Sequence, residues 1–530
     1  MTPHPDLLVV GAGPTGLALA LQAHAHGARV RVVERRPSPF RPSRALIVHP
    51  RTLEVLRPLG VVDALLARAD TAPAAHLHLG RRVVPVRLTD VDLPDTAYPH
   101  LTLLRQADVE TVLDRALAER GVRVERGTDL TEIADAYGAR SRVTLRGPAG
   151  IERGSYRWVV GCDGADSTVR RAAGIGWHGG GYRPEIVLAD LELDGDLAPG
   201  AAHVVAGRRG LLFVFALGEC ATWRLLATRP CTDPNLPFGR SGPPVDPGDL
   251  QRLLDDAGLP ARIRRVAWSS VVRVQHRLAA TYRRGPLIVA GDAAHTHSPA
   301  AAQGMNTGIQ DAANLGWKLA LAATSTAPEQ LVDSYDRERR PVARHVLALT
   351  HAVFWAEAGT DPLASFVRGT LAPLGAPVVP VALRLRRPVA EVVRLLARFG
   401  EHYRSSPISV EARPRPPDGP HAGDRLPDAT ATTADGRRVR LHALLAHPGV
   451  HVLQPDDPAI PAVRPTGPLV HVHRLAATPW TGGVLAVRPD GHIGFRGAPD
   501  GALRDWLARV GATPAAGGRP PEPDEEKAAR

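Results

Sequence analysis

The stretch Gly285–Lys318, GPLIVAGDAAHTHSPAAAQGMNTGIQDAANLGWK, predicts a strand, a loop and a helix. The apolar run Leu287–Ala290, bounded by Gly-Pro and Gly-Asp, is typical of a buried strand, although so short a run does not by itself exclude a helix. After a loop of small residues, apolar positions at helical spacing begin close to Gly304. The start of such a helix attracts an anion through its free N–H groups and its dipole, and Asp292 at the strand end offers a carboxylate to hydroxyl groups.

A second segment, at the N-terminus, predicts a nucleotide-binding unit. A buried strand over Leu7–Val10 runs into the turn GAGPTG (Gly11–Gly16), a helix follows, and a second strand, Ala28–Val33, ends at Glu34. The glycines permit a tight turn and a close approach of the backbone to a pyrophosphate at the helix N-terminus. Glu34 stands where an acid that binds the ribose hydroxyls is expected, and a carboxylate there disfavours a 2′-phosphate. The segment therefore predicts FAD or NAD rather than NADP.

The third segment is Gly161–Arg170, GCDGADSTVR, which follows residues Ser141–Val160, a run that alternates like a β-hairpin. In order and spacing the three segments resemble the fingerprints of the flavin-dependent aromatic hydroxylases, the single-component class A monooxygenases. A plain NAD dehydrogenase would account for the N-terminal segment and leave the other two without a role. The resemblance implies that FAD lies extended across all three segments.

The resemblance also implies roles for residues of the first stretch. Asp292 would contact the ribityl chain of FAD, and the backbone of Met305 and Asn306 would face the N1–C2=O edge of the isoalloxazine ring. Pro299, in the loop over the flavin, would help to shape the oxygen pocket. This part of the chain is thus expected to stabilise the reduced, anionic flavin.

One departure from the family lies beside these residues. The family usually has Gly-Gly before the Gln-Gly pair, whereas this chain has Ala301-Ala302 before Gln303-Gly304. The two additional methyl groups would narrow the path of the flavin or shift the loop. The departure therefore concerns the mobility of the flavin rather than its binding.

Four residues outside the first stretch take roles from the same resemblance. Arg44 would approach the cofactor, and the alternative for it is a surface charge. Gln106, with Arg105 as second candidate, would bind ribityl or phosphate oxygens, and the alternative is a satisfied helix cap. Asp163 would anchor its loop or a ribityl hydroxyl. The predicted cofactor-binding residues are Gly11, Gly13, Pro14, Thr15, Gly16, Glu34, Arg35, Arg44, Arg105, Gln106, Asp163, Asp292, Pro299, Gly304, Met305 and Asn306, of which Pro299 and Arg44 are assigned to the catalytic centre.

From Trp177 to Trp268 the sequence changes to short alternating or apolar runs with turns at Gly and Pro, which predict an antiparallel sheet. In the family such a sheet roofs the substrate cavity. Phe213, Phe215 and Trp223 would then offer aromatic surface to a flat substrate, although aromatic residues on a strand face also serve as core. The sequence identifies no acid or base for catalysis.

Composition limits the other functions. The net charge of +11 comes from dispersed arginines, which a compositional bias explains better than nucleic-acid binding. Cys162, Cys220 and Cys231 show neither metal-ligand spacing nor an even disulfide framework, which fits a reducing compartment and predicts no metal. The N-terminus carries no signal sequence and no membrane span, so a cytoplasmic location is expected.

The predicted fold class is α/β, with several domains. A Rossmann-like FAD-binding domain of the glutathione-reductase type would comprise residues 1–175 and, with further helices, 276–400, and the antiparallel substrate sheet would comprise 176–275. A Pro-rich span, Glu411–Pro420, marks a linker, and the sequence after it resembles the thioredoxin-like domain of larger class A hydroxylases, to which residues 401–513 are assigned. They contain no cysteine, so disulfide chemistry is excluded and packing or a homodimer contact is expected. Residues 514–530 are predicted to be disordered.

The resemblance implies an FAD- and NAD(P)H-dependent monooxygenase that inserts one oxygen atom from O₂ into a polycyclic aromatic, polyketide-type substrate through a flavin C4a-hydroperoxide. Hydroxylation, epoxidation, Baeyer–Villiger insertion and ring rearrangement share the same fingerprints, and so do NADH and NADPH dependence. Two alternatives stay open: inactivation of an aromatic antibiotic, and a flavin-loaded binding protein without turnover.

Overall fold

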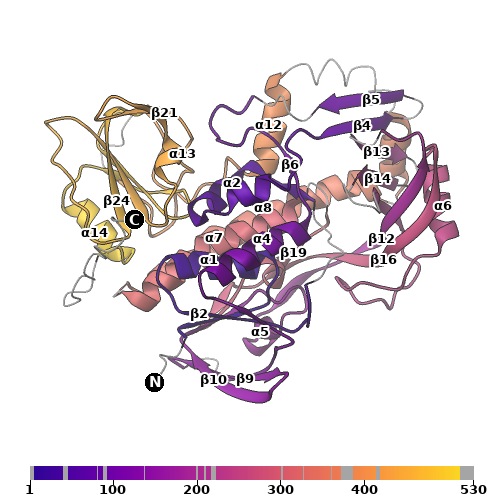
Figure 1. Ribbon diagram of the computed structural model, residues 1–530, viewed down its shortest axis with the longest axis horizontal. Coiled ribbons are helices and arrows are strands. Elements are labelled where there is room, and N and C mark those ends of the chain that lie inside the picture. The colour runs from indigo at the N-terminus through magenta and orange to yellow at the C-terminus, as the bar shows by residue number, and fades with distance from the viewer. Residues whose placement is uncertain are drawn as a thin grey trace, which may run out of the picture.

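The computed structural model describes residues 5–39, 46–79, 82–87, 92–135, 138–198, 201–207, 210–216, 223–299, 302–325, 327–359, 361–371, 386–412 and 418–513. Arg44, Ala301 and Cys220 lie outside the described residues, as do the predicted tail, 514–530, and part of the predicted linker. Figure 1 shows three units side by side: a central α/β unit, a second sheet on the right, and a C-terminal unit, coloured orange to yellow, on the left.

The central unit is built on a six-stranded sheet with the order β17-β18-β11-β1-β2-β7. All neighbours in it pair parallel except β17 and β18, which pair antiparallel. The strands are β1 (Leu7–Val10), β2 (Val30–Glu34), β7 (Val124–Arg126), β11 (Trp158–Gly161), β17 (Arg283–Arg284) and β18 (Leu287–Val289). The strands predicted near residues 7–10, 28–33 and 287–290 are therefore confirmed. Because β11 pairs with both β1 and β18, the three predicted segments end at one edge of one sheet.

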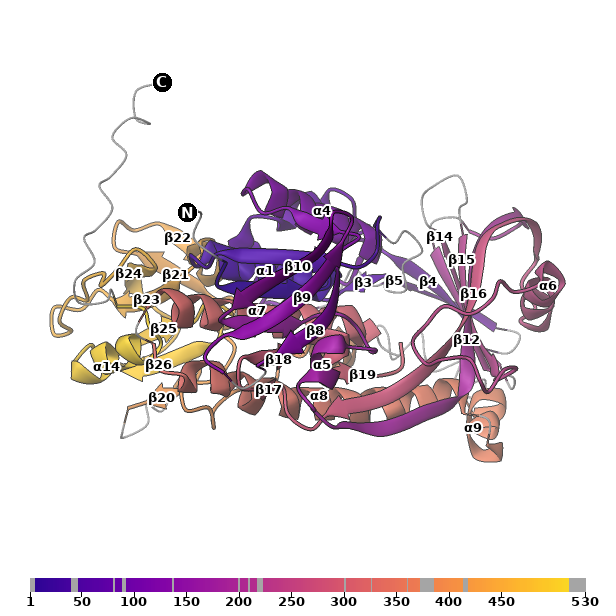
Figure 2. The same cartoon turned by 90° about the horizontal axis from the view of Figure 1, so that it is seen from below.

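Helices cover this sheet. In Figure 1, α1 (Pro14–Ala25) lies between α4 (Gln106–Glu119) and α7 (Gln303–Thr324), and α8 (Gln330–Ala358) runs behind them. Figure 2 shows that α8 continues from the central unit to the second sheet. The helix predicted near Gly304 is thus α7, and its apolar face is buried against α1, β18 and α8.

The predicted hairpin at residues 141–160 is confirmed in its first part. Strands β9 (Ser141–Gly147) and β10 (Gly150–Tyr156) pair antiparallel around the turn at Gly147-Pro148, and β8 (Asp129–Ala134) adds a third strand. Residues 158–161 do not belong to the hairpin, since they form β11 of the central sheet.

The second sheet has the order β19-β16-β12-β15-β14-β13-β4-β5. Its longest strands, β12 (Trp177–Gly195) and β16 (Ala261–Ala279), pair antiparallel. The others are β4 (Ala74–Leu79), β5 (Arg82–Arg87), β13 (Ala201–Gly207), β14 (Gly210–Ala216), β15 (Trp223–Pro230) and β19 (His295–Thr296). The antiparallel sheet predicted for residues 176–275 is confirmed. It is extended by β4, β5 and β19 from outside that range, and β4 pairs parallel with β13.

The two faces of the second sheet are covered differently. Helix α6 (Pro247–Asp256) packs on one face and buries a core around Val187, Val214 and Leu225. The end of α8 packs on the other face, where Phe354 meets Leu188. The face that meets α8 is therefore the one turned toward the central unit (Figure 2).

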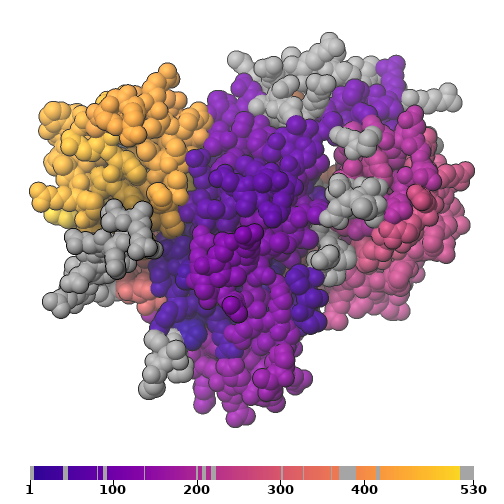
Figure 3. Space-filling view, viewed as in Figure 1, coloured from indigo at the N-terminus to yellow at the C-terminus, as the bar shows by residue number. Residues whose placement is uncertain are grey.

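The C-terminal unit is a seven-stranded mixed sheet in the order β20-β26-β25-β23-β24-β21-β22. Its elements are β20 (Val410–Glu411), β21 (Thr430–Thr433), β22 (Arg438–Arg440), α13 (Leu441–Leu444), β23 (Val450–Pro455), β24 (Val470–Ala477), β25 (Val484–Val487), β26 (Ile493–Gly497) and α14 (Gly501–Arg509). Trp317 and Leu321 of α7 and Leu331 of α8 share one hydrophobic core with Val452 and Trp506 of this unit. Figure 3 shows the C-terminal unit in close contact with the central unit.

Three further observations concern the described residues alone. Cys162 and Cys231 carry free thiols. Among these residues no group of His, Cys, Asp or Glu side chains could hold a metal ion. Among the described helices, none combines the length and the apolar composition that a membrane crossing requires.

Candidate flavin-binding site

The glycine-rich turn between β1 and α1 leaves room for a ligand at one position. A Cβ at Gly11, where φ is +103°, would lie 2.4 Å from the carbonyl oxygen of Cys162, and a Cβ at Gly16 would lie 1.9 Å from the carbonyl oxygen of Gly11. A Cβ at Gly13 would meet no heavy atom within 4 Å. Two glycines are thus required by packing, whereas Gly13 borders open space at the N-terminus of α1, which fits an extended diphosphate.

Glu34 lies next to this glycine-rich turn and is hydrogen-bonded to it. Its carboxylate, at the end of β2, accepts the backbone N–H of Ala12 at 2.9 Å and both the N–H (2.9 Å) and Nε (3.0 Å) of Arg36. Burial by itself would raise the pKa of Glu34, but the Arg36 guanidinium and the two N–H groups lower it overall, so the group is an anion at neutral pH. The neighbouring Arg35, which is predicted to bind the cofactor, is exposed.

Asp163 anchors its own loop. Its Oδ2 accepts the N–H groups of Thr168 (2.7 Å) and Val169 (3.3 Å) at the start of α5 (Thr168–Ala172). Burial raises the pKa of this carboxyl. Of its two predicted roles, the loop anchor is confirmed by these distances, and the contact to a ribityl hydroxyl stays a prediction.

Arg170 connects the third segment to the first stretch. Its guanidinium stacks 3.9 Å from the ring centre of Trp177 and donates to the carbonyl oxygen of Ala293 at 2.8 Å and of Ala165 at 2.6 Å. Because Ala293 follows Asp292 in the chain, this hydrogen bond fixes the backbone next to Asp292.

Asp292 lies in the short helical turn Gly291–Ala293 that follows β18, and it is exposed. The preceding Gly291, with φ of +60°, donates its N–H to Asp311 Oδ2 at 3.1 Å. Asp311 also accepts His295 Nε2 and Arg339 Nε, each at 2.7 Å. The strand end is therefore fixed from the buried side, while the carboxylate of Asp292 stays accessible to a ligand.

The first turn of α7 is tied to the start of α2 (Pro50–Leu56) and to the chain segment that precedes it. The side chain of Asn306 accepts the N–H of His49 (2.8 Å) and the hydroxyl of Thr52 (2.7 Å), and it donates to the carbonyl oxygens of Ile47 and Ala302, both at 2.8 Å. Its amide is thus fully used within the protein. What the helix start offers to a ligand is backbone N–H, and the contact of Met305 and Asn306 with the flavin stays a prediction.

The loop before α7 contains a non-glycine residue in the left-handed backbone conformation. Ala302, at the N-cap, has φ of +51° and ψ of +38°, and its N–H donates to the carbonyl oxygen of Pro299 at 3.0 Å. This left-handed conformation suits glycine and is strained for alanine. A Cβ at Gly304 would lie 3.8 Å from His297, its nearest neighbour, which is an ordinary van der Waals contact, so the backbone at Gly304 is not crowded.

We expect Ala302→Gly to raise the free energy of unfolding by about 0.5 kcal/mol, because relief of left-handed strain outweighs the added entropy of the unfolded chain. Urea unfolding of the apoprotein measures the change. The matched control is Ala118→Gly at an exposed position of α4, which is expected to destabilise by about 1 kcal/mol. Equal destabilisation by both substitutions would contradict the strained geometry at Ala302.

Arg105 and Gln106 stand at the start of α4 and bond within that helix. Arg105 Nε donates to Asp108 at 2.6 Å, and Gln106 Nε2 donates to Glu110 at 2.8 Å. Arg105 occupies the N-cap position without a side-chain capping bond. The segment before them, β6 (Thr102–Leu103), pairs with β3 (Ile47–Val48), to which Asn306 is bonded. The structure therefore brings this segment close to the start of α7.

The three predicted substrate residues do not share one surface. Phe213 and Phe215 lie opposite Leu226 and Arg224 on the face of the second sheet that meets α8. Trp223 points to the other face, where it is 7% exposed and packs in the core beneath α6. Trp223 is adjacent to Arg224 on β15, and adjacent positions of a strand face opposite sides of the sheet. The prediction that Trp223 contacts the substrate together with the two phenylalanines is therefore wrong.

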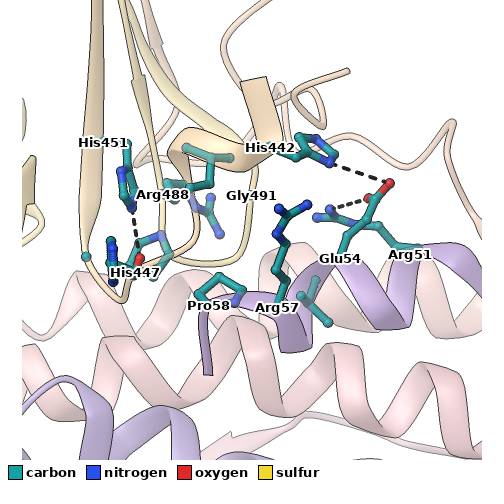
Figure 4. Close-up of a pocket in the computed structure, with 13 residues that line it drawn as sticks. Arg51, Glu54, Arg57, Pro58, His442, His447, His451, Arg488 and Gly491 are labelled. Atoms are coloured by element: carbon teal, nitrogen blue, oxygen red, sulfur yellow. Dashed lines mark hydrogen bonds and ion pairs between the residues drawn. The ribbon is translucent and has the colours of Figure 1, made fainter. Parts of the chain in front are cut away.

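Two hollows lie away from these residues. The cavity in Figure 4, between α2 and the C-terminal unit, has a volume of about 20 Å³, which is room for about one water molecule. A groove of about 860 Å³ over β9 and β10 is lined by arginine and glutamate side chains, including Arg31 and Glu152. Neither contains any residue predicted to bind FAD.

Residues 5–350 match the family described as FAD binding domain. The chain belongs to this family and is an FAD-dependent monooxygenase of the class A aromatic hydroxylase type, a class that takes electrons from NAD(P)H and oxygen from O₂.

Relatives and solved structures extend beyond this segment. The 6-methylpretetramide 4-monooxygenase of Streptomyces rimosus is 37% identical over 76% of this chain and 71% of its own length. The 12-dehydrotetracycline 5-monooxygenase/anhydrotetracycline 6-monooxygenase of Streptomyces rimosus subsp. rimosus is 33% identical over 95% of this chain and 98% of its own. The structure of the anhydrotetracycline hydroxylase OxyS from Streptomyces rimosus superposes with a TM-score of 0.76 at 29% identity, covering 97% of this chain and 100% of that one.

Proposed function

We propose that this monooxygenase inserts one oxygen atom from O₂ into a polycyclic aromatic polyketide during the biosynthesis of a secondary metabolite. The relatives named above act on tetracycline-type compounds, which supports this substrate class. The observation that carries the proposal is the meeting of three separate segments at one edge of one parallel sheet, after β1, β11 and β18. Ligands of open α/β sheets bind outside this edge.

Particular residues would hold the cofactor. The turn at Gly13 and the N-terminus of α1 would bind the pyrophosphate, and the carboxylate of Glu34 the ribose hydroxyls. Asp292 would bind the ribityl chain, and the first-turn N–H groups of α7 would face the ring edge on which negative charge develops. When bound, FAD supplies the transfer of electrons from NAD(P)H to O₂ and of oxygen to the substrate.

The substrate would lie between this ring and the second sheet. Phe213 and Phe215, on the face of that sheet turned toward the central unit, would contact its flat surface and exclude water. Pro299, in the loop over the flavin, would help to shape the oxygen pocket. Gln106, Arg105 and Arg44 stay predictions as cofactor contacts.

We also propose the domain limits given above, with the C-terminal unit as a thioredoxin-like domain. Parallel pairing of β23 with β24, antiparallel pairing of β23, β25 and β26, and a final helix, α14, support that comparison. A cytoplasmic location and a homodimer stay predictions.

The test is turnover by the purified protein. Oxidation of NADH and NADPH is followed with and without a panel of tetracyclic phenols, and products are analysed by mass spectrometry. Substrate-stimulated oxidation with a product heavier by one oxygen atom is expected. Stimulated oxidation that yields only hydrogen peroxide with every member of the panel would contradict the substrate class. A product that has lost the antibacterial activity of its precursor would instead favour antibiotic inactivation.

Asp292→Ala is expected to weaken FAD binding by roughly 1.5 to 3 kcal/mol, because a charge-assisted hydrogen bond is lost. Titration of the apoprotein with FAD, followed by flavin fluorescence, gives the dissociation constant. Asp457→Ala, at an exposed turn of the C-terminal unit, is the control and should leave the constant unchanged. An unchanged FAD affinity in Asp292→Ala would refute the assigned contact.

A further inference from the structure

The C-terminal unit inserts a charged turn behind the candidate flavin site. The turn, Arg488–His492, joins β25 to β26 and has the sequence RPDGH, in which Gly491 adopts φ of +75°. Such a sequence is typical of an exposed turn. Here, however, Arg488 is 1% exposed and Asp490 2% exposed. Charged side chains are buried to this degree only when they are paired, so the partners of this turn are informative.

Asp490 bonds to two elements of the central unit at once. Its Oδ2 accepts Asn314 Nδ2 of α7 at 3.0 Å and Arg488 Nη2 at 2.5 Å. Its carbonyl oxygen accepts Arg51 Nη2 of α2 at 2.6 Å. Figure 4 shows α2, with Arg51 and Glu54, facing this part of the C-terminal unit. The next residue along α2, Thr52, is one of the partners of Asn306 at the start of α7.

Arg488 also holds α7, through Glu338 of α8. Its guanidinium donates to both carboxylate oxygens of Glu338 at 2.8 Å, and Glu338 also accepts Lys318 Nζ and Asn314 Nδ2, each at 2.7 Å. Two cations thus face two anions, Glu338 and Asp490, in a site shielded from water. Loss of one charge would leave another buried charge unbalanced, and this is far more costly than loss of a surface ion pair.

A third route starts at His492. Its ring lies 4.2 Å from the ring of Tyr403, whose hydroxyl accepts Arg339 Nη1 at 3.0 Å. Arg339 also donates to Asp311 at 2.7 Å and to the carbonyl oxygen of Thr307, in the second turn of α7, at 3.2 Å. Asp311 in turn holds the N–H of Gly291, next to Asp292. The first and third routes therefore reach the backbone near the candidate ring position, whereas the second holds α7 further along, at Asn314 and Lys318.

We propose that the Asp490 turn is a positioning element for the flavin: through α2, α7 and the Tyr403–Arg339 contact it fixes the backbone around the isoalloxazine ring and thereby sets both the affinity for FAD and its reduction potential. This inference rests on the proposed FAD site. It assigns the cysteine-free C-terminal unit a part in the flavin chemistry that needs no thiol, since the unit acts from behind the helix whose N-terminus faces the ring.

The decisive variant is Asp490→Asn in the full chain, because it keeps the shape of the side chain and removes its charge. Its matched control is Asp435→Asn, which alters another Asp-Gly turn of the same unit, at an exposed position where Asp435 pairs with Arg437 at 2.7 Å. Three properties are measured: the FAD dissociation constant, the visible circular dichroism of the bound flavin, and the reduction potential by reductive titration. Asp490→Asn is expected to weaken FAD binding about tenfold and to change the dichroism and the potential, with no change in the control.

A purely structural role would give a different result. If Asp490→Asn lowers only the melting temperature and keeps the wild-type FAD affinity, dichroism and potential, the proposal is overturned. If this variant does not fold, Tyr403→Phe decides, because it removes one hydroxyl from the third route. That variant is expected to weaken FAD binding about threefold and to shift the potential, and wild-type values for both would overturn the proposal. Failure of the wild-type chain to bind FAD would refute the FAD site itself.

Discussion

Gly13→Val is expected to abolish the retention of FAD while leaving the apoprotein folded. The physical reason is the open space at Gly13, where an added Cβ would meet no protein atom within 4 Å. The backbone there, with φ of −77° and ψ of −179°, is also one that valine adopts without strain. The isopropyl group would occupy the volume that the pyrophosphate needs, and we expect the FAD dissociation constant to rise about 100-fold.

Two measurements check this prediction: the FAD dissociation constant and the melting temperature of the apoprotein. Gly400→Val is the control, because Gly400 has equally open surroundings and is not part of the glycine-rich turn. Gly16→Ala should behave in the opposite way to Gly13→Val, since its Cβ would lie 1.9 Å from a backbone oxygen and the apoprotein itself would be destabilised. Wild-type FAD binding by Gly13→Val would show that the cofactor does not pass this turn.

Asn306→Ala is expected to lower the free energy of unfolding by about 3 kcal/mol and to weaken FAD binding as well. The substitution leaves the N–H of His49, the hydroxyl of Thr52 and the carbonyl oxygen of Ile47 without their partner in a buried place. Each such group costs about 1 to 3 kcal/mol, and water that enters the cavity recovers part of this. Because these bonds align the start of α7, the N–H groups offered to the flavin would also lose their fixed direction.

Urea unfolding of the apoprotein and titration with FAD measure the two effects separately. Asn235→Ala, at an exposed loop position, is the matched control and should change neither. If Asn306→Ala unfolded at the wild-type urea concentration, the four hydrogen bonds of this amide would not be a significant tie between α7 and the segment before α2.

Local sequence patterns were sufficient to predict the parts of the fold that are local in origin. The run Leu7–Val10, the run beginning at Leu287 and the helix beginning beside Gly304 each carry their own apolar period and their own glycine boundary, and the structure confirms all three. Their assembly at one sheet edge followed from the family resemblance rather than from any of the three patterns.

Pairing between distant segments could not be predicted in this way. β4 and β5, from residues 74–87, extend a sheet assigned to residues 176–275, because a strand edge accepts any partner of suitable register. Register also explains the error at Trp223: the sequence shows that Phe213 and Phe215 share a face, but the face of a neighbouring strand depends on how the two strands align.

Some contacts of the candidate site could have been predicted from local sequence, and others could not. Arg36, rather than Arg35, bonds Glu34, and the two-residue period of an extended chain would have pointed to it. The partners of Asn306 lie more than 250 residues away in the sequence, at His49 and Thr52, and no local pattern announces them. The sequence of the Asp490 turn, RPDGH, would have predicted an exposed turn, whereas the structure buries it.

The shared core of Trp317, Leu321 and Trp506 has a consequence for protein engineering. Exchange of C-terminal segments between homologous enzymes is a common way to build chimaeras, and a linker rich in proline invites a cut near residue 412. In this chain such a cut would divide one apolar interior in two and leave the indole of Trp317 facing solvent. A successful graft would have to carry the outward face of α7 along with the segment it exchanges.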